Sequence, residues 1–143
     1  FEGTDLSVGR GTNKQFQVYG HPDFSAGIYA FTPKPMEGAK YPVQQEKKCL
    51  GYDLSTTPIK DLQNQKQLNI NYLSNFYKKA SSGLKAKYFL NNGFFHKLVG
   101  NKDLMAQVKA GKSEAEIRKS WEKDLETYKK MRKQYLLYQD FED

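Results

Sequence analysis

Short apolar runs separated by turn residues occupy the first part of the chain. The β-prone runs cover residues 16–19, 28–32 and 49–54, and glycines, prolines and threonines lie between them. Runs of this length and setting predict short strands. Gly51 lies inside the third run, where a glycine predicts a bulge or the close approach of another backbone. Residues 34–48 show no periodicity and predict an exposed loop.

From Thr57 onward the apolar positions recur at helical spacing. Thr57 is the predicted N-cap, and Pro58 follows at the first helical position, where its missing N–H costs nothing. Gly83 is expected to end or to follow the next helix, which covers the apolar positions between residues 70 and 80. That helix is predicted to pack on the sheet through an apolar stripe, which consists of Ile70, Leu73, Phe76, Tyr77 and Ala80.

Two more helices are predicted toward the end of the chain. The first covers residues 102–110 and stops at Gly111, and Ser113 with Glu116 then forms an S-x-x-E capping box for the second. The residues at 135–138 are apolar on all sides and are expected to leave this helix and lie across another surface. We expect the long helix to bury one side in the core, comprising Ile117, Trp121, Leu125, Tyr128, Met131 and Tyr135.

These elements predict an α+β fold, in which a small mixed sheet from the first half packs against helices from the second and the chain ends in a long helix. A length of 143 residues fits one domain, which we predict to span residues 1–143. Hydrophobic residues make up 38% and charged residues 27%, a composition typical of a folded, soluble chain. No apolar run approaches the roughly 20 residues that cross a bilayer, so no membrane span is predicted.

The net charge of +7 is concentrated between Lys60 and Lys97, where seven lysines face a single acid, Asp61. Such a face is either an ordinary surface exposed to solvent, or it attracts nucleic acid, an anionic membrane or an acidic polymer such as peptidoglycan. The lone Cys49 excludes an internal disulfide. The only histidines, His21 and His96, lack a metal-ligand spacing, and we predict neither a metal nor a cofactor.

The opening loop, residues 1–12, combines glycines with polar and charged side chains. Glu2 offers a carboxylate for acid–base work in glycoside cleavage, which normally uses a pair of carboxyl groups, and Asp5 is the nearest second one. Hydroxyls at Thr4, Ser7 and Thr12 suit sugars, and Arg10 suits a carboxylate. The alternative is a glycine-rich turn whose Glu2 and Arg10 pair with each other. The spacing fits neither phosphate-binding pattern, GxxxxGK[ST] or GxGxxG.

Several motifs in the same order resemble the C-terminal region of the NamZ-type exo-β-N-acetylmuramidases, the family also called domain of unknown function 1343. They are FEGTDLSVGRGT at 1–12, FQVYG at 16–20, FTP at 31–33 and CLGYDL at 49–54. The resemblance continues from KLVGNK at residue 97 to RKQYLLY, which ends at residue 138. One departure is YGHPDF, in which Phe24 has to supply the family's aromatic residue and His21 and Asp23 have no assigned role.

The resemblance implies an enzyme of the bacterial cell envelope, periplasmic or secreted, that removes N-acetylmuramic acid from the non-reducing ends of peptidoglycan fragments. It implies a muropeptide or muramyl sugar as substrate and a Rossmann-like N-terminal domain as the partner across the active-site cleft. This chain would be the C-terminal domain, inactive alone, with the principal catalytic carboxylate in the other domain. Glu2 would act as acid or base or orient the substrate, and the substrate-binding residues would be Thr4, Asp5, Ser7, Arg10 and Thr12.

The alternative function is a non-enzymatic basic module that holds nucleic acid or another anionic polymer on the Lys60–Lys97 face. The aromatic residues fall at helical core spacing and do not alternate with lysines on one surface. We therefore predict no nucleic-acid partner and favour the cell-wall glycosidase.

Overall fold

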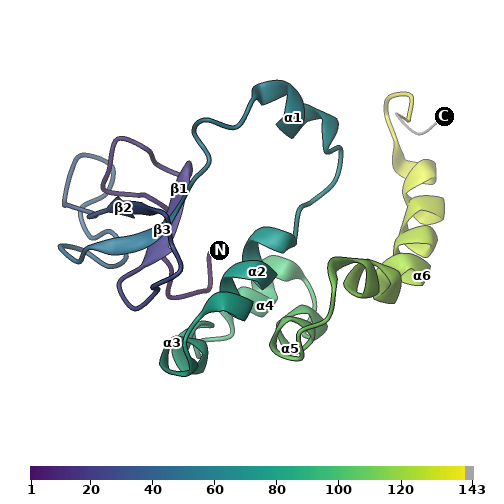
Figure 1. Ribbon diagram of the computed structural model, residues 1–143. Coiled ribbons are helices and arrows are strands. Elements are labelled where there is room, and N and C mark those ends of the chain that lie inside the picture. The colour runs from purple at the N-terminus through teal and green to yellow at the C-terminus, as the bar shows by residue number, and fades with distance from the viewer. Residues whose placement is uncertain (141–143) are drawn as a thin grey trace. The chain divides into compact units, whose positions relative to one another are not determined.

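In the computed structural model, which describes residues 1–140, three strands are followed by the helices (Figure 1), as an α+β fold requires. The chain divides into one unit at residues 1–111 and a second from residue 112 onward. The strands are β1 (Val18–His21), β2 (Tyr29–Phe31) and β3 (Cys49–Asp53). The first unit also holds α1 (Ile59–Asn64), α2 (Asn71–Lys79), α3 (Ser82–Lys87), α4 (Phe94–Val99) and α5 (Asp103–Lys109). The second holds α6 (Glu114–Arg132) and a 3-10 helix, η1 (Lys133–Tyr135).

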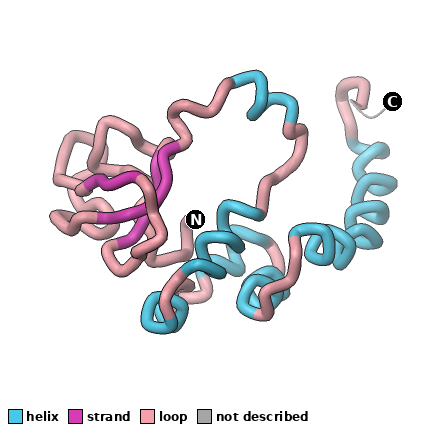
Figure 2. The backbone as a smooth tube through the Cα atoms, viewed as in Figure 1, coloured by secondary structure: helices cyan, strands magenta, loops and turns pink. Residues whose placement is uncertain are grey.

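The strands form one sheet in the order β1-β3-β2, and β3 pairs antiparallel with both neighbours. The α+β class and the three strand positions are confirmed, whereas the expectation of a mixed sheet is wrong. Parallel pairing needs a long crossover, usually a helix. The connections between these strands are loops (Figure 2), so each strand returns antiparallel to its partner.

Gly51 lies at the centre of the sheet and confirms the predicted close approach of two backbones. It pairs with Gly20 on β1, and a β-carbon at Gly51 would lie 1.8 Å from the carbonyl oxygen of Tyr19. Because any side chain would collide with a neighbouring strand, the central position of β3 requires glycine.

The two faces of the sheet carry different layers. On one face Val18, Phe31 and Cys49 form a small buried cluster. On the other face Tyr19 pairs with Tyr52, and the two ring centres lie 5.5 Å apart. This second face is the one that meets α2, so tyrosines line the contact between sheet and helix.

Phe76 of α2 joins the helix to the sheet, as its predicted apolar stripe requires. Its side chain is buried and stacks on Phe24 with ring centres 3.8 Å apart. The aromatic contacts continue from Phe76 to Tyr88 at 6.1 Å and from Tyr88 to Phe89 at 4.9 Å. Burial of these rings holds the first unit together, and the match of Phe24 to the family's aromatic residue stays a prediction.

Several helix ends in the structure differ from their predicted positions. The N-cap of α1 is Pro58 rather than Thr57, without a side-chain capping bond. Gly83 lies inside α3, since α2 already ends at Lys79 and Ser81 caps the next helix by accepting from the Leu84 amide at 3.2 Å. Gly111 follows α5 with a φ of +73°, as predicted for a helix stop.

The capping box of α6 is confirmed, because the Ser113 amide donates to Glu116 and the Ser113 hydroxyl accepts from the Glu116 amide. The predicted burial of the apolar side of α6 is wrong beyond Ile117. Trp121 is only half-buried, and the rest of the stripe is exposed, as are the residues at 135–138. Among its described residues the second unit has one long helix and one 3-10 turn, which gives α6 no second layer within the unit.

No helix within residues 1–140 is long and apolar enough to cross a membrane.

Candidate functional site

The opening loop is fixed by backbone pairing with two other segments of the first unit. Ser7 exchanges two backbone hydrogen bonds of 3.0 Å with Gly20 of β1. The Leu90 amide donates to the Gly3 carbonyl at 2.9 Å. Gly3 has a φ of +83°, and a β-carbon there would lie 2.6 Å from the backbone of Phe95. Glycine is therefore required at this position both by the turn and by the close packing of the loop against the start of α4.

The three hydroxyls predicted to bind substrate have partners inside this loop. Thr4 donates to the Phe1 carbonyl at 2.6 Å, and Thr12 donates to the Gly9 carbonyl at 2.7 Å. The Ser7 hydroxyl accepts from the Gly9 amide at 3.4 Å, and Ser7 is fully buried. These contacts shape the loop, and a role of the hydroxyls in substrate binding stays a prediction.

Asp5 is held in place by two side chains. Its carboxylate accepts from Gln44 at 3.0 Å and lies 3.1 Å from Nε2 of the buried His21. Nδ1 of His21 accepts from the Asp23 amide at 2.9 Å, so the ring proton lies on Nε2 and is donated to Asp5. The Asp23 carboxylate pairs with Lys87 at 2.8 Å. His21 and Asp23, which the resemblance left without a role, thus orient Asp5 and tie β1 to α3.

Glu2 and Arg10 are the members of the predicted site whose side chains are exposed. Arg10 donates through Nη2 to the Gly38 carbonyl at 3.0 Å, and the structure does not pair it with Glu2. Glu2 lies in the wall of a hollow of about 250 Å³, which we call the Glu2 hollow. The rest of its wall is apolar and aromatic, formed by Phe1, Val8, Phe16, Val18, Tyr19 and Leu54.

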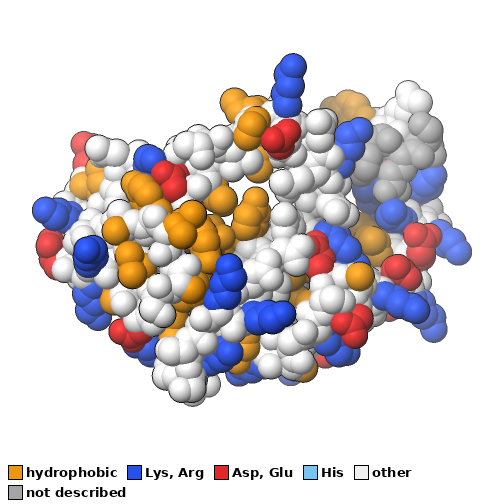
Figure 3. Space-filling model, viewed as in Figure 1, with side chains coloured by type: hydrophobic (Ala, Val, Ile, Leu, Met, Phe, Trp, Pro, Cys, Tyr) orange, Lys and Arg blue, Asp and Glu red, His pale blue; other side chains and the backbone are white. Residues whose placement is uncertain are grey.

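A second hollow of about 320 Å³ lies between the sheet and α2, and we call it the tyrosine–asparagine hollow. It shares Tyr19 and Leu54 with the Glu2 hollow, so the two are adjacent. Figure 3 shows hydrophobic side chains gathered on this part of the first unit, with cationic side chains beside them. The other lining residues are Ile28, Tyr52, Asp53, Asn69, Asn71, Tyr72, Asn75, Phe76 and Lys79.

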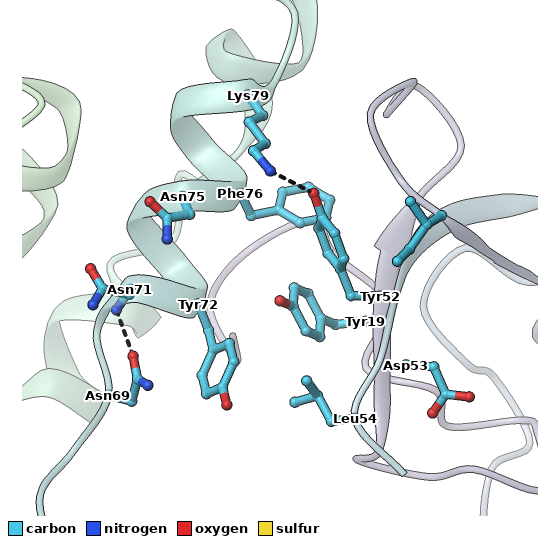
Figure 4. A pocket seen from close by; sticks show the side chains of 11 residues that line it. Tyr19, Tyr52, Asp53, Leu54, Asn69, Asn71, Tyr72, Asn75, Phe76 and Lys79 are labelled. Carbon is cyan, nitrogen blue, oxygen red and sulfur yellow. Dashed lines mark hydrogen bonds between the residues drawn. The ribbon is translucent and has the colours of Figure 1, made fainter. Parts of the chain in front are cut away.

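Helix α2 supplies one whole wall of this hollow (Figure 4). Asn71, Asn75 and Lys79 recur every fourth residue and form a polar stripe beside Tyr72 and Phe76. The apolar stripe of this helix was predicted from the sequence, whereas its polar stripe was not. The four-residue repeat of amides and a lysine beside aromatic residues was the signal that would have found the hollow.

The two ends of the tyrosine–asparagine hollow differ in charge. Lys79 donates to the Tyr52 hydroxyl at 3.2 Å, and its ammonium lies 5.5 Å from the centre of the same ring. Asp53 lies in the wall and contacts the Lys14 ammonium. The bonds from Lys14 and Ser55 lower the pKa of Asp53 to about 2, so this carboxylate is ionised at neutral pH. The positive charge of Lys79 thus lies on α2, and the negative charge of Asp53 lies at the end of β3.

A small sheet with packed helices, and an exposed carboxylate beside an aromatic hollow, define a domain suited to a polar ligand with an apolar face. The family model described as the C-terminal part of the exo-β-N-acetylmuramidase NamZ matches residues 1–138. The chain therefore belongs to this family of cell-wall glycosidases, which confirms the resemblance derived from its motifs.

Two relatives agree with this assignment. The peptidoglycan β-N-acetylmuramidase NamZ of Bacillus subtilis (strain 168) is 28% identical over 96% of this chain and 35% of its own length. A crystal structure of a DUF1343 family protein from Bacteroides fragilis superimposes with a TM-score of 0.86 and is 42% identical, covering 98% of this chain and 38% of that one. The chain thus spans little more than a third of either relative, and its place as the C-terminal domain of a two-domain protein stays a prediction.

Proposed function

We propose that this chain is the C-terminal, cleft-forming part of an enzyme that releases N-acetylmuramic acid from the non-reducing ends of peptidoglycan fragments. The observation that carries the proposal is the family match over residues 1–138. The name of the Bacillus subtilis relative, a peptidoglycan β-N-acetylmuramidase, supports the same reaction. Such a substrate lies outside the cytoplasm, so the protein would act in the bacterial cell envelope or after secretion.

Glu2 is the residue of this chain that we assign to the reaction. It is exposed in the wall of the Glu2 hollow, whereas the Asp5 carboxylate is occupied by His21 and Gln44. Glycoside cleavage usually uses two carboxyl groups on opposite sides of the bond. In this proposal Glu2 is one of them or orients the sugar, and a Rossmann-like N-terminal domain supplies the other. Arg10, also exposed, is available to the lactyl carboxylate of the sugar.

The lysine-rich segment offers little support for the nucleic-acid alternative. Lys79 and Lys85 lie over the rings of Tyr52 and Tyr77, at 5.5 and 5.7 Å from the ring centres. In this arrangement these two lysines cover rings on which bases could otherwise stack. We therefore favour the glycosidase.

The test is a Glu2→Gln substitution in a full-length protein that carries this chain, assayed with an aryl β-N-acetylmuraminide. The change keeps the shape of the side chain but removes its charge and its transferable proton. An acid–base role predicts a loss in kcat of about 10²-fold or more. A purely orienting role that binds ground and transition states alike predicts a higher KM with kcat unchanged. The matched control is Glu122→Gln on α6, which should leave both constants unchanged. If Glu2→Gln also leaves both unchanged, Glu2 has no role in the reaction.

A further inference from the structure

Phe16, which opens the FQVYG motif, has a backbone conformation that side chains rarely adopt. Its φ is +60°, in the left-handed region, where a bulky residue is strained. Three other residues within 1–140 that are not glycine share a positive φ, and all three are polar or charged: Gln44, Glu46 and Lys66. Glycine would adopt the same conformation without strain. A phenylalanine at this position therefore needs a reason that the turn itself does not supply.

The turn around Phe16 is held by three backbone hydrogen bonds. The Phe16 amide donates to the Val8 carbonyl at 2.8 Å, and the Gln17 amide donates to the Lys14 carbonyl at 3.1 Å. The Leu54 amide donates to the Gln17 carbonyl at 2.7 Å. All three bonds join backbone atoms alone, so any residue at position 16 can make them. The phenyl ring is not needed to form the turn.

The ring of Phe16 also contributes little to the core. Phe16 is 66% exposed, whereas Val18, two residues further along the chain, is 1% exposed. Phe1 and Tyr19 stack on each other with ring centres 4.6 Å apart, but Phe16 contacts no other aromatic ring of the described residues. A residue that is strained and also exposes apolar surface costs stability twice. Such residues cluster at functional sites, where the surrounding structure holds them in place.

The exposed ring lies beside the exposed carboxylate of the opening loop. Phe16 and Glu2 both line the Glu2 hollow of about 250 Å³, and both side chains are exposed. The Phe1–Tyr19 stack forms another part of the same wall. The strained turn thus presents a free aromatic face at the one hollow in which the proposed function places a reacting group.

We propose that Phe16 is a substrate-contacting residue, and that its ring packs on the group that is bound next to Glu2. The fixed turn holds the ring in position before binding, so little conformational freedom is lost when the substrate arrives. An aromatic face packs on the ground state and the transition state alike, and Phe16 therefore acts on binding rather than on the chemical step. The inference rests on the proposed function, because it assigns Phe16 to the same site as Glu2.

The test is a set of Phe16 variants in a full-length protein that carries this chain, assayed with an aryl β-N-acetylmuraminide and unfolded in urea. Phe16→Gly removes the ring and the strain together. KM should rise about ten-fold with little change in kcat, because one aromatic contact is lost. The urea midpoint should stay equal or rise, because glycine adopts a positive φ freely. Phe16→Tyr keeps the ring and should keep the KM of the wild type.

Two further variants separate the ring from the flexibility of the turn. Glu46→Gly is the matched control, because Glu46 has a φ of +59°, is exposed and lies outside the Glu2 hollow. It should leave KM unchanged, with a urea midpoint equal to that of the wild type or higher. Phe16→Asn places a residue that tolerates the left-handed region at the same position. It lacks the ring and should raise KM as Phe16→Gly does.

The inference is overturned if Phe16→Gly keeps the KM of the wild type, or if Phe16→Tyr raises KM as much as Phe16→Gly. It is also overturned if Phe16→Gly lowers the urea midpoint well below that of Glu46→Gly, since the ring would then serve folding. A loss of kcat in Glu2→Gln together with an unchanged KM in Phe16→Gly contradicts this inference alone. An inactive wild type contradicts the proposed function, and the role of Phe16 then fails with it.

Discussion

Replacing Gly51 by alanine tests whether the contact between β1 and β3 determines the stability of the first unit. The new β-carbon would lie 1.8 Å from the Tyr19 carbonyl oxygen and 2.6 Å from the Gly20 α-carbon. Real β-carbons essentially never come within 3.0 Å of such atoms, so the strands must separate by about 1.2 Å at this point. Both atoms belong to backbone, and no side-chain rotation relieves the collision.

The cost follows from the position of β3 in the middle of the sheet. Overpacking alone costs about 1–3 kcal/mol where side chains can adjust. Here β1 has to move instead, which weakens at least one ladder hydrogen bond worth about 1 kcal/mol. We expect Gly51→Ala to lower the free energy of unfolding by about 2–4 kcal/mol, a large part of the 5–15 kcal/mol typical of a domain. The same shift would displace Tyr19 and Tyr52 and so disturb both hollows.

Urea unfolding followed by circular dichroism measures this change. The matched control is Gly83→Ala in α3, where the structure leaves open space within 4 Å of the new β-carbon. At this helical position alanine should raise stability by about 0.5–1 kcal/mol. A loss below about 1 kcal/mol for Gly51→Ala, or similar effects of the two substitutions, would refute the reasoning.

Two further predictions concern single polar contacts. The folded-state pKa of Asp53 lies at about 2, below its ordinary value of 3.8. Its ionised form therefore stabilises the fold above pH 3.8, and that contribution is lost as pH falls toward 2. The melting temperature of the wild type should therefore drop more steeply over this range than that of Asp53→Asn, and parallel curves would contradict the Lys14–Asp53 pair. Ser113→Ala removes the N-cap of α6 and should cost about 1 kcal/mol. Amide hydrogen exchange in the first turn of α6 should then become faster, and an unchanged rate would show that the capping box is not stabilising.

The fold could be predicted from the sequence where a local pattern determines the element. The strands, α2, α5 and α6 follow periodicity, and the α6 capping box is a local signature. The short helices α3 and α4 were not predicted, because six residues carry too little periodicity and depend on burial of Leu84 and Phe95. Their local signals were weaker: Ser81 as an N-cap, and Gly93 and Gly100 in left-handed conformation at the two ends of α4.

The site was predictable only in part, because it joins segments that lie far apart in sequence. Exposure of Glu2 and Arg10 could be expected from a polar, glycine-rich loop. The role of Thr4 and Ser7 inside the loop depends on partners that only the folded backbone provides. The tyrosine–asparagine hollow requires Tyr19 and Tyr52 to face α2, which depends on the register of β1 against β3.

We propose above that this chain is one part of a bipartite muramidase. The most direct test compares the 143-residue chain with a full-length protein that carries it, using release of chromophore from an aryl β-N-acetylmuraminide. The full-length protein should cleave the substrate and the 143-residue chain should not, since one of the two carboxyl groups is then missing. Full activity in the 143-residue chain, or none in the full-length protein, would contradict the account.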